Sequence, residues 1–384
     1  MSTADISKID KNFAGEEIKC DGLKIYNIRE PLFQIYGLYQ PYEKEGFKRM
    51  PHNEAAKMNS NIKTLYTHTS GGRLRFCTDS TRIFLRSVLP TITKFDHMPK
   101  TGVSCFDLYV DGEYMNTFRH GMLNGLGQEA KSENAYDSNL TIKEKKMHDI
   151  LIHFPLYNPV EDVFIGLDTN AVIMPAKEYK YIKPIVFYGS SITQGACASH
   201  PGNAYFNILS RRLNTDIVNL GFSSGCLGEE PMAEYLSNLD MSILVYDYDH
   251  NAPTVEHLRK THETTFKTIR KKQPNLPVIM ITAADRSYEI PERREVIYQT
   301  YINAVNRGDK NVYFINGHSY AGKSTMVKML AERYDMIALL LQTAPKVHHN
   351  YAKRIITHNL PKAIIVDFRC AKIIPTLLFQ SASV

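Results

Sequence analysis

The sequence predicts two domains, an all-β sandwich or jelly roll followed by an α/β domain with a parallel sheet. Three observations predict this arrangement. Up to about Met174 the chain reads as short alternating strands broken by turns. From Ile182 onward, apolar strands alternate with helical patterns, which is typical of a parallel sheet with helices on both faces. The 384 residues, 43% of them hydrophobic, are enough to form two cores.

The first domain is expected over residues 1–175, and its strands are predicted from period-two alternation. Thr64 to Pro90 contains alternating stretches around a Ser-Gly-Gly turn, and His148 to Tyr157 alternates again. Ser104 to Phe118 predicts a hairpin with Asp111-Gly112 at its turn. The polar stretch from Gln128 to Asn139 predicts a surface loop or the end of a hairpin.

The second domain is expected over residues 182–316, after a linker from Pro175 to Lys183. Apolar runs predict five strands, at 184–189, 216–221, 242–247, 277–283 and 311–316. Helical patterns between them predict four helices, at 203–214, 229–238, 254–272 and 291–307.

Bulk properties narrow the class of protein further. The amino end is polar and mixed in charge, with no sign of a secretory or transit leader, so the expected location is the cytoplasm. The longest apolar run, Met336 to Leu341, is far shorter than the roughly 18 residues of a membrane span. The six cysteines are scattered without a C-x-x-C pair, which predicts reduced core residues and no zinc site.

The formal charge of +6 is concentrated in the last part of the chain. From Leu340 onward a single acid, Asp367, faces these bases: Lys346, Lys353, Arg354, Lys362, Arg369 and Lys372. The rest of the chain is nearly neutral, so we expect no nucleic-acid-binding face on the main fold.

Three polar positions follow successive buried strands of the predicted sheet. Ser191 lies in KPIVFYGSSITQG, Gly221 in DIVNLGFSSG and Asn251 in MSILVYDYDHNAP. Open α/β sheets place their reacting groups at the carboxyl ends of strands. A serine nucleophile needs a base beside it and donors aimed at the oxyanion, and the N–H groups of Ser191 and Gly221 and the amide of Asn251 are candidate donors.

These segments resemble a known family. GSSITQG, NLGFSSG and DYDHNAP, in that order, are similar to the first three blocks of the SGNH (GDSL-type) hydrolase superfamily. GGRLRFCTDS and GVSCFDLYVDG resemble the domain, named for its Gly-x-Asp-Leu-Tyr signature, that precedes the hydrolase domain in one subgroup. The resemblance implies a flavodoxin-like three-layer domain behind a β-sandwich. It also implies an esterase or deacetylase that forms an acyl-enzyme on Ser191, with Gly221 and Asn251 as further catalytic residues.

Neighbouring polar residues have alternative explanations. Each of the three positions taken alone could be an ordinary turn or packing residue. Asp247, Asp249 and His250 are expected to tether the Asn251 loop by hydrogen bonds rather than to take part in chemistry. Asp107 and Tyr109 are expected to be structural.

The Asp-x-x-His pair that should supply the base of such a hydrolase is missing after the fifth predicted strand. The histidines after Asn316 are His318, His348, His349 and His358, and the residues three positions before them are Ile315, Pro345, Lys346 and Ile355. None of these is an aspartate. His349 is only a weak candidate for the base.

A phosphate-binding pattern occupies this place instead. Gly317, Gly322, Lys323 and Ser324 fit G-x-x-x-x-G-K-[ST] after an apolar run and before a helical pattern. Residues 317–384 therefore form an atypical C-terminal segment that resembles a fragment of a P-loop kinase. A working nucleotide site needs an acidic strand and base-binding elements in addition.

The leading hypothesis is a serine esterase with a small-molecule ester substrate, such as an acetyl ester on a carbohydrate. We expect no metal or organic cofactor, no nucleic-acid partner and no membrane partner. The absence of tryptophan argues against sugar stacking, although 23 tyrosines could replace it. Two alternatives stand beside it: an inactive SGNH scaffold that acts as a binding module, and nucleotide binding through residues 317–324.

Overall fold

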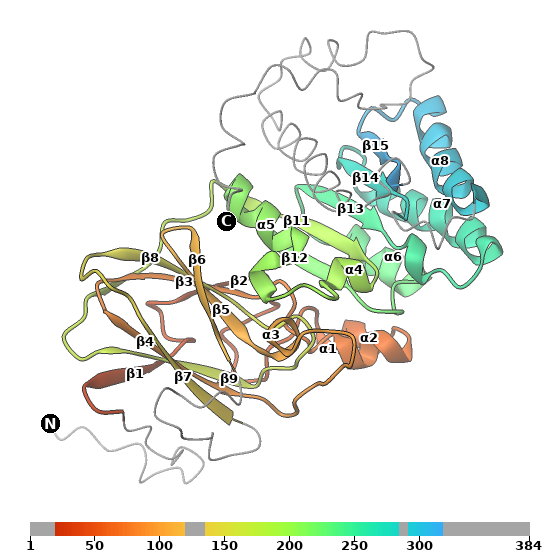
Figure 1. Ribbon diagram of the computed structural model, residues 1–384. Helices are drawn as coiled ribbons and strands as arrows, with labels where there is room; N and C mark the ends of the chain where they lie inside the picture. Colours follow the sequence, from red (N-terminus) through yellow and green to blue (C-terminus); the bar gives the residue numbers. More distant parts are fainter. Residues whose placement is uncertain (1–19, 120–134, 284–290, 318–384) are drawn as a thin grey trace, which may run out of the picture. The chain divides into compact units, whose positions relative to one another are not determined.

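The computed structural model describes residues 20–119, 135–283 and 291–317, and these form two compact units (Figure 1). The first unit contains the chain up to Arg49, Thr67–Glu178 and Ala196–Ala204. The second contains Met50–Tyr66, Tyr179–Gly195 and the chain from Tyr205 onward. No helix in the described ranges combines the length and the hydropathy that a membrane span needs.

The first unit contains two antiparallel sheets. One sheet has the order β1 (Leu23–Asn27), β9 (Asp162–Asp168), β4 (Arg82–Val88) and β7 (Ala135–Thr141). The other has the order β10 (Ile173–Met174), β3 (Arg73–Thr78), β8 (His148–His153), β5 (Phe106–Val110) and β6 (Glu113–Phe118), with β2 (Gln34–Tyr36) paired to β3. Side chains of both sheets, such as Leu74, Ile83 and Phe106, join one buried apolar cluster. The predicted all-β sandwich is confirmed.

The turn of the predicted hairpin follows from its sequence. Asp111 and Gly112 join β5 to β6, and both have positive φ, 53° and 89°. Two-residue hairpin turns of this kind favour Asp-Gly, because both positions lie in the left-handed region. The stretch before the Ser-Gly-Gly turn is not a strand, in contrast to the expectation for Thr64 onward. It contains the end of α2 (Ser60–Leu65).

The second unit is built on a five-stranded parallel sheet. Its order is β12 (Thr215–Gly221), β11 (Tyr181–Gly189), β13 (Ile243–Asp247), β14 (Val278–Ile281) and β15 (Val312–Ile315). The helices between the strands are α4 (Ser191–Gln194), α5 (Tyr205–Leu213), α6 (Glu230–Ser237), α7 (Val255–Lys272) and α8 (Pro291–Asn306). This strand order is that of flavodoxin-like folds, so the predicted α/β class is confirmed.

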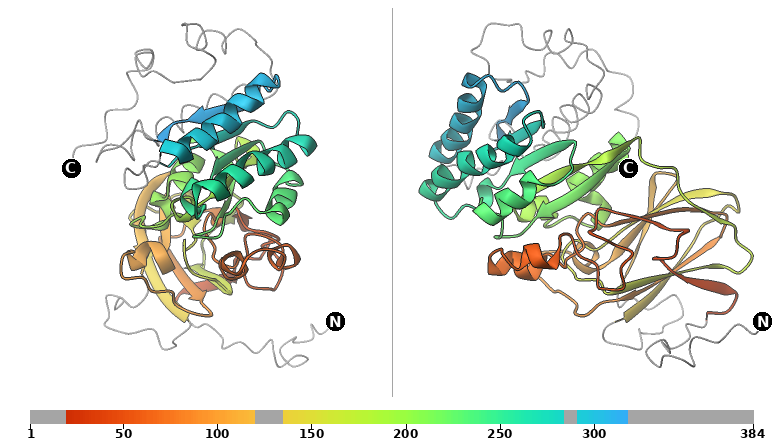
Figure 2. Two further views of the ribbon diagram at one scale, coloured as in Figure 1. Left: turned by 90° about the vertical axis from the view of Figure 1, so that its right-hand side faces the viewer. Right: turned by 180° about the vertical axis from the view of Figure 1, so that it is seen from behind.

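Alternating side chains of the sheet face two different layers. Tyr188 and Tyr246 belong to a buried cluster with α6, α7 and α8, which lie side by side in Figures 1 and 2. The intervening residue Phe187 contacts Tyr205 and Phe206 of α5, with ring centroids 5.6 and 6.2 Å apart. Because consecutive strand residues point to opposite faces, α5 covers one face of the sheet and α6–α8 cover the other.

A segment from early in the chain belongs to the second unit. Residues 50–66, with α1 (His52–Ala55) and α2, contribute four buried side chains to the cluster that contains Leu220 and Phe222. These are Met50, Ala55, Met58 and Ile62. The sequence placed this segment inside the first domain, so the division of the structure differs from the expected boundary here.

Candidate active site

The three polar positions predicted from the sequence lie at one edge of the parallel sheet. In the pairing register, Gly189 at the end of β11 lies opposite both Gly221 of β12 and Asp247 of β13. The three strands therefore end at the same level. Ser191 follows the first of them, Gly221 ends the second, and Asn251 follows the third.

Ser191 is the first residue of the short helix α4 and is half-buried. The preceding Ser190 caps this helix, because its hydroxyl accepts a hydrogen bond of 3.3 Å from the Ile192 N–H. The Ser190 N–H donates to the Asp247 carbonyl at 3.3 Å, which ties the start of α4 to the end of β13. A Cβ at Gly189 would lie 2.3 Å from Thr193 Oγ1, so only glycine lets the strand end this close to α4.

Gly221 has a packing role in this arrangement. A Cβ at this position would lie 2.6 Å from the backbone of Thr193 and Gln194 in α4. Its N–H, which the sequence suggested as an oxyanion donor, donates to Asn219 Oδ1 at 2.7 Å. The other end of the same amide, Asn219 Nδ2, donates to the Thr193 carbonyl at 2.7 Å. Buried Asn219 thus fixes β12 to α4, a function that the sequence analysis did not anticipate.

Asn251 contacts the loop after β12 through both ends of its side chain. It lies on the short helix η4 (Asp249–Asn251). Its Nδ2 donates to the Phe222 carbonyl at 2.9 Å, and its Oδ1 accepts from the Ser224 N–H at 3.1 Å. The backbone amide beside Asn251 is therefore that of Ser224. Nothing in the sequence singles out Ser224, because its φ of 54° lies in a region where glycine is usual.

A further contact fixes the Ser191 helix to the same loop. The side chain of Gln194 in α4 is buried, and its Oε1 accepts a hydrogen bond of 2.9 Å from the Ser223 N–H. The helix with Ser191, the loop with Ser224 and the turn with Asn251 are therefore held together by direct hydrogen bonds.

Asp249 tethers the Asn251 turn, as expected from the sequence. Its carboxylate pairs with Arg293 Nε of α8 at 2.8 Å and accepts from the Ala283 N–H at 2.9 Å. Both side chains of the ion pair are almost completely buried. Arg293 also donates to the Asp249 and Ala252 carbonyls, so a buried side chain of α8 stabilises the backbone of the turn. Asp247 acts on the neighbouring helix instead, since its Oδ2 accepts from Thr193 Oγ1 at 3.4 Å. His250, between Asp249 and Asn251, is half-buried.

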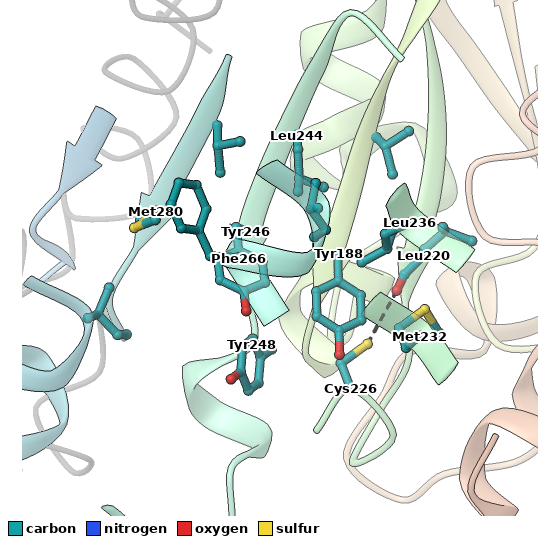
Figure 3. Packing of buried hydrophobic residues seen from close by; sticks show 14 of the residues in the cluster. Tyr188, Leu220, Cys226, Met232, Leu236, Leu244, Tyr246, Tyr248, Phe266 and Met280 are labelled. Atoms are coloured by element: carbon teal, nitrogen blue, oxygen red, sulfur yellow. Dashed lines mark hydrogen bonds between the residues drawn. The ribbon is translucent and has the colours of Figure 1, made fainter. Parts of the chain in front are cut away.

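Three buried tyrosines, Tyr188, Tyr246 and Tyr248, lie close together in the core of the second unit (Figure 3). The Tyr188 hydroxyl accepts from the Gly228 N–H at 3.0 Å, and the Tyr248 hydroxyl is 2.8 Å from Thr261 Oγ1. Burial is the main cause that raises the pKa of all three phenols. They therefore stay neutral, and Tyr188 bonds the loop after β12, whereas Tyr246 and Tyr248 bond to α7.

Asp107 and Tyr109 take part in packing within the first unit. Asp107 Oδ2 accepts a 2.6 Å bond from the Gly202 N–H and pairs with His200 Nδ1. A Cβ at Gly202 would lie 2.4 Å from the Tyr109 hydroxyl, so this glycine packs directly on the tyrosine ring. The expected structural role of both residues agrees with these contacts.

The last described residue, Gly317, is the first glycine of the phosphate-binding pattern. Its N–H donates to Thr282 Oγ1 at 2.8 Å, and a Cβ there would lie 2.3 Å from the Thr282 carbonyl oxygen. Close packing between the ends of β14 and β15 accounts for this glycine. The other pattern residues, Gly322, Lys323 and Ser324, lie outside the described residues, as do His318, His348, His349 and His358.

Family comparisons agree with this geometry. The GDSL-like lipase/acylhydrolase family matches residues 182–330. Residues 182–330 are a GDSL-like acylhydrolase domain. The N-terminus of SGNH-hydrolase-type esterases, known as GxDLY, matches residues 23–173. The two parts of the chain are thus similar to the hydrolase domain of SGNH-type esterases and to the N-terminal domain that precedes it in them. The acylhydrolase match also includes residues 317–324, which carry the phosphate-binding pattern.

Solved structures share this two-part fold at low identity. A protein described as a GDSL-like lipase of Bacteroides ovatus has a TM-score of 0.72 and 22% identity, over 83% of this chain and 98% of its own. A salicylyl-acyltransferase from a tetracycline biosynthetic pathway has a TM-score of 0.65 and 15% identity, over 86% and 100%. An acetyl xylan esterase of the rumen bacterium Butyrivibrio proteoclasticus has a TM-score of 0.53 and 12% identity, over 83% and 99%. None of the curated proteins compared with the chain is significantly similar to it.

Proposed function

We propose that this GDSL-like hydrolase is a serine esterase that cleaves small esters through an acyl-enzyme on Ser191. One observation carries the proposal: hydrogen bonds join the Ser191 helix, the Ser224 loop and the Asn251 turn at a single edge of the sheet. This arrangement supports a nucleophile with candidate oxyanion donors held close to one another before the reaction begins.

The proposed reaction begins when Ser191 Oγ attacks the ester carbonyl carbon and its proton passes to a base. The carbonyl oxygen becomes an oxyanion, and the base gives its proton to the leaving alcohol as the acyl-enzyme forms. Water then loses a proton to the same base and attacks the acyl-enzyme, and the acid product leaves as the base returns this proton to Ser191 Oγ. The base is to be sought among the four histidines after Asn316, although none of them belongs to an Asp-x-x-His pair.

The proposed oxyanion donors are revised by the contacts of the loop. Asn251 Nδ2 has two hydrogens, and one of them is donated to Phe222, so the second can reach an oxyanion. The Ser191 N–H is the second donor, as the sequence suggested. The third is the Ser224 N–H, which would exchange its 3.1 Å bond to Asn251 Oδ1 for a bond to the oxyanion. Gly221 acts indirectly, by letting α4 approach β12.

We propose an acetyl ester, on a carbohydrate or on a small alcohol, as the substrate. The name of the acetyl xylan esterase among the similar folds supports this class. Release of acetate from an acetylated xylo-oligosaccharide, compared with release from p-nitrophenyl acetate, distinguishes a carbohydrate substrate from a simple ester.

The function is tested by replacing the nucleophile. With p-nitrophenyl acetate, Ser191→Ala should lower kcat/KM by at least about 10³-fold and abolish the initial burst of p-nitrophenol. The matched control is Ser242→Ala, because Ser242 precedes β13 at the opposite end of the same sheet. A fluorophosphonate should add to the Ser191 peptide of the unaltered protein. Equal rates for the parent and Ser191→Ala would overturn the proposal.

A second candidate function is favoured by the missing Asp-x-x-His pair. A hydrolase scaffold without a base would bind an ester and not turn it over. Single changes of His318, His348, His349 and His358 to Ala separate the two functions, because loss of turnover in one of them identifies the base. If the parent has no turnover but is stabilised by an acetylated sugar in a thermal-shift assay, the binding function is favoured. Nucleotide binding is addressed in the same assay with magnesium and ATP.

A further inference from the structure

The loop that carries Ser224 is held by a segment that does not belong to the alternating strands and helices of the hydrolase domain. Residues 222–229 connect β12 to α6 and contain neither helix nor strand. The segment Met50–Tyr66, which precedes the β-sandwich strands β3–β10, packs against this loop in the second unit. Two asparagines of this segment, Asn59 and Asn61, make the polar contacts.

Asn61 holds the carbonyl side of Ser224. Its Nδ2 donates to the Ser224 carbonyl at 3.0 Å. On the other side, the Ser224 N–H donates to Asn251 Oδ1. Side-chain amides from two different elements thus bind the two backbone polar groups of one residue.

This support matters because Ser224 has an unfavourable backbone conformation. At φ 54° it lies in the left-handed region, where a Cβ comes too close to the following carbonyl oxygen. Ser224 is also exposed. Hydrogen bonds from neighbouring elements therefore have to hold the residue in this conformation.

Asn59 anchors the same loop one residue further along. Its Oδ1 caps α2 by accepting from the Asn61 and Ile62 N–H groups. Its Nδ2 donates to the Gly225 carbonyl at 2.8 Å and to Glu229 Oε2 at 2.7 Å. A Cβ at Gly225 would lie 2.9 Å from Ile62 Cγ1, so the glycine lets the loop lie directly on α2.

We propose that Asn59 and Asn61 are positioning residues of the esterase, which fix the Ser224 amide where the oxyanion forms. This inference rests on the proposed function. It assigns to residues 50–66 a part in the reaction, although they lie more than a hundred positions before Ser191 in the chain. Their removal should weaken transition-state stabilisation and leave substrate binding nearly unchanged.

The test compares Asn61→Ala and Asn61→Asp with Lys63→Ala, an exposed position on the same helix. Asn61→Ala should lower kcat for p-nitrophenyl acetate about 10-fold with less than about a twofold change in KM, since small displacements of a donor reduce turnover strongly. Asn61→Asp should be slower still, because a carboxylate would face the Ser224 carbonyl oxygen. Asn61→Gln, which keeps an amide donor, should recover part of the rate. Rates within twofold of the parent for both Asn61→Ala and Asn61→Asp would overturn the proposal.

Asn59 is tested with a substitution that keeps the helix cap. Asn59→Asp retains the oxygen that caps α2 but removes the donor to Gly225, and it places a second carboxylate beside Glu229. We expect an unchanged α2 and a fall in kcat similar to that of Asn61→Ala. An unaffected kcat would contradict the assignment for Asn59.

Amide hydrogen exchange distinguishes failure of this proposal from failure of the proposed function. In Asn61→Ala the amides of residues 223–226 should exchange at least about 10-fold faster than in Lys63→Ala, at equal melting temperature. This readout does not depend on turnover. If the parent has no esterase activity, the proposed function fails while faster exchange still supports the positioning role. Unchanged exchange would overturn the positioning role whatever the activity.

Discussion

Ser224 combines a strained backbone with a position beside Asn251. Glycine loses nothing by adopting φ 54°, whereas serine does. Ser224→Gly should therefore raise the free energy of unfolding by about 0.5–1 kcal/mol, the relief of strain being partly offset by the larger entropy of glycine in the unfolded chain. Urea denaturation measures the change.

Ser223→Gly is the matched control for this prediction, because Ser223 is the adjacent serine and does not have positive φ. Ser223→Gly should destabilise the protein or leave it unchanged. A destabilised Ser224→Gly variant would show that the hydroxyl contributes more than the backbone strain costs.

At the scale of residues, the sequence located Ser191 and Asn251 because each follows a recognisable buried strand. It did not reveal Asn219, which lies inside a strand and looks like an ordinary polar residue there. Its role depends on a 2.7 Å contact with a helix that lies 26 positions earlier in the chain. Ser224 was missed because only the folded backbone shows which residue has positive φ.

The Asp249–Arg293 pair joins two elements, the Asn251 turn and α8. Arg293→Met would leave the buried Asp249 carboxylate without its counter-charge, which typically costs about 3–5 kcal/mol. We expect a corresponding loss of stability in urea and a weaker hold on Asn251. Arg294→Met is the control, because it removes the same charge from the neighbouring, less buried position.

A double variant checks the cause of this loss. In Asp249→Asn the buried carboxylate charge is already absent. Arg293→Met should therefore cost less stability in Asp249→Asn than it does in the parent. Additive losses would mean that Arg293 acts by packing and by its bonds to the Asp249 and Ala252 carbonyls.

At the scale of elements, the sequence predicted the parallel sheet more completely than the sandwich. Each of the five predicted strands overlaps an observed one, and the helix predicted at 254–272 is observed as Val255–Lys272. Strands buried on both faces form continuous apolar runs, which are easy to find. The helices α1 and α2 are only four and six residues long, so their few apolar positions show no helical period.

Acid sensitivity is a property of the molecule as a whole, because each unit contains a buried histidine whose pKa is strongly lowered. Burial lowers the pKa of His68 in the first unit and of His262 in the second to about 3. Since the unfolded value is near 6.5, the unfolded chain binds more protons between these two pH values. The stability that the neutral histidines contribute is complete above pH 6.5 and is lost as the pH falls toward 3.

We predict that the free energy of unfolding falls by about 1.4 kcal/mol per pH unit for each histidine within this window. His262→Gln keeps a partner for Thr300, which bonds His262 Nδ1 at 3.0 Å, but does not titrate. The stability difference between the parent and His262→Gln, from urea denaturation at pH 7, 5.5 and 4.5, should therefore shrink at lower pH. Parallel pH profiles would contradict the assignment.

The assignment of residues 50–66 to the second unit affects how the protein is made on the ribosome. α1 and α2 emerge before residues 67–178 and well before β11 and β12, which they pack against. At ~5–20 residues per second, their apolar face waits on the order of 10 s for its partners. During synthesis Met50, Ala55, Met58 and Ile62 therefore stay exposed as an apolar patch while the strands of the β-sandwich are being made.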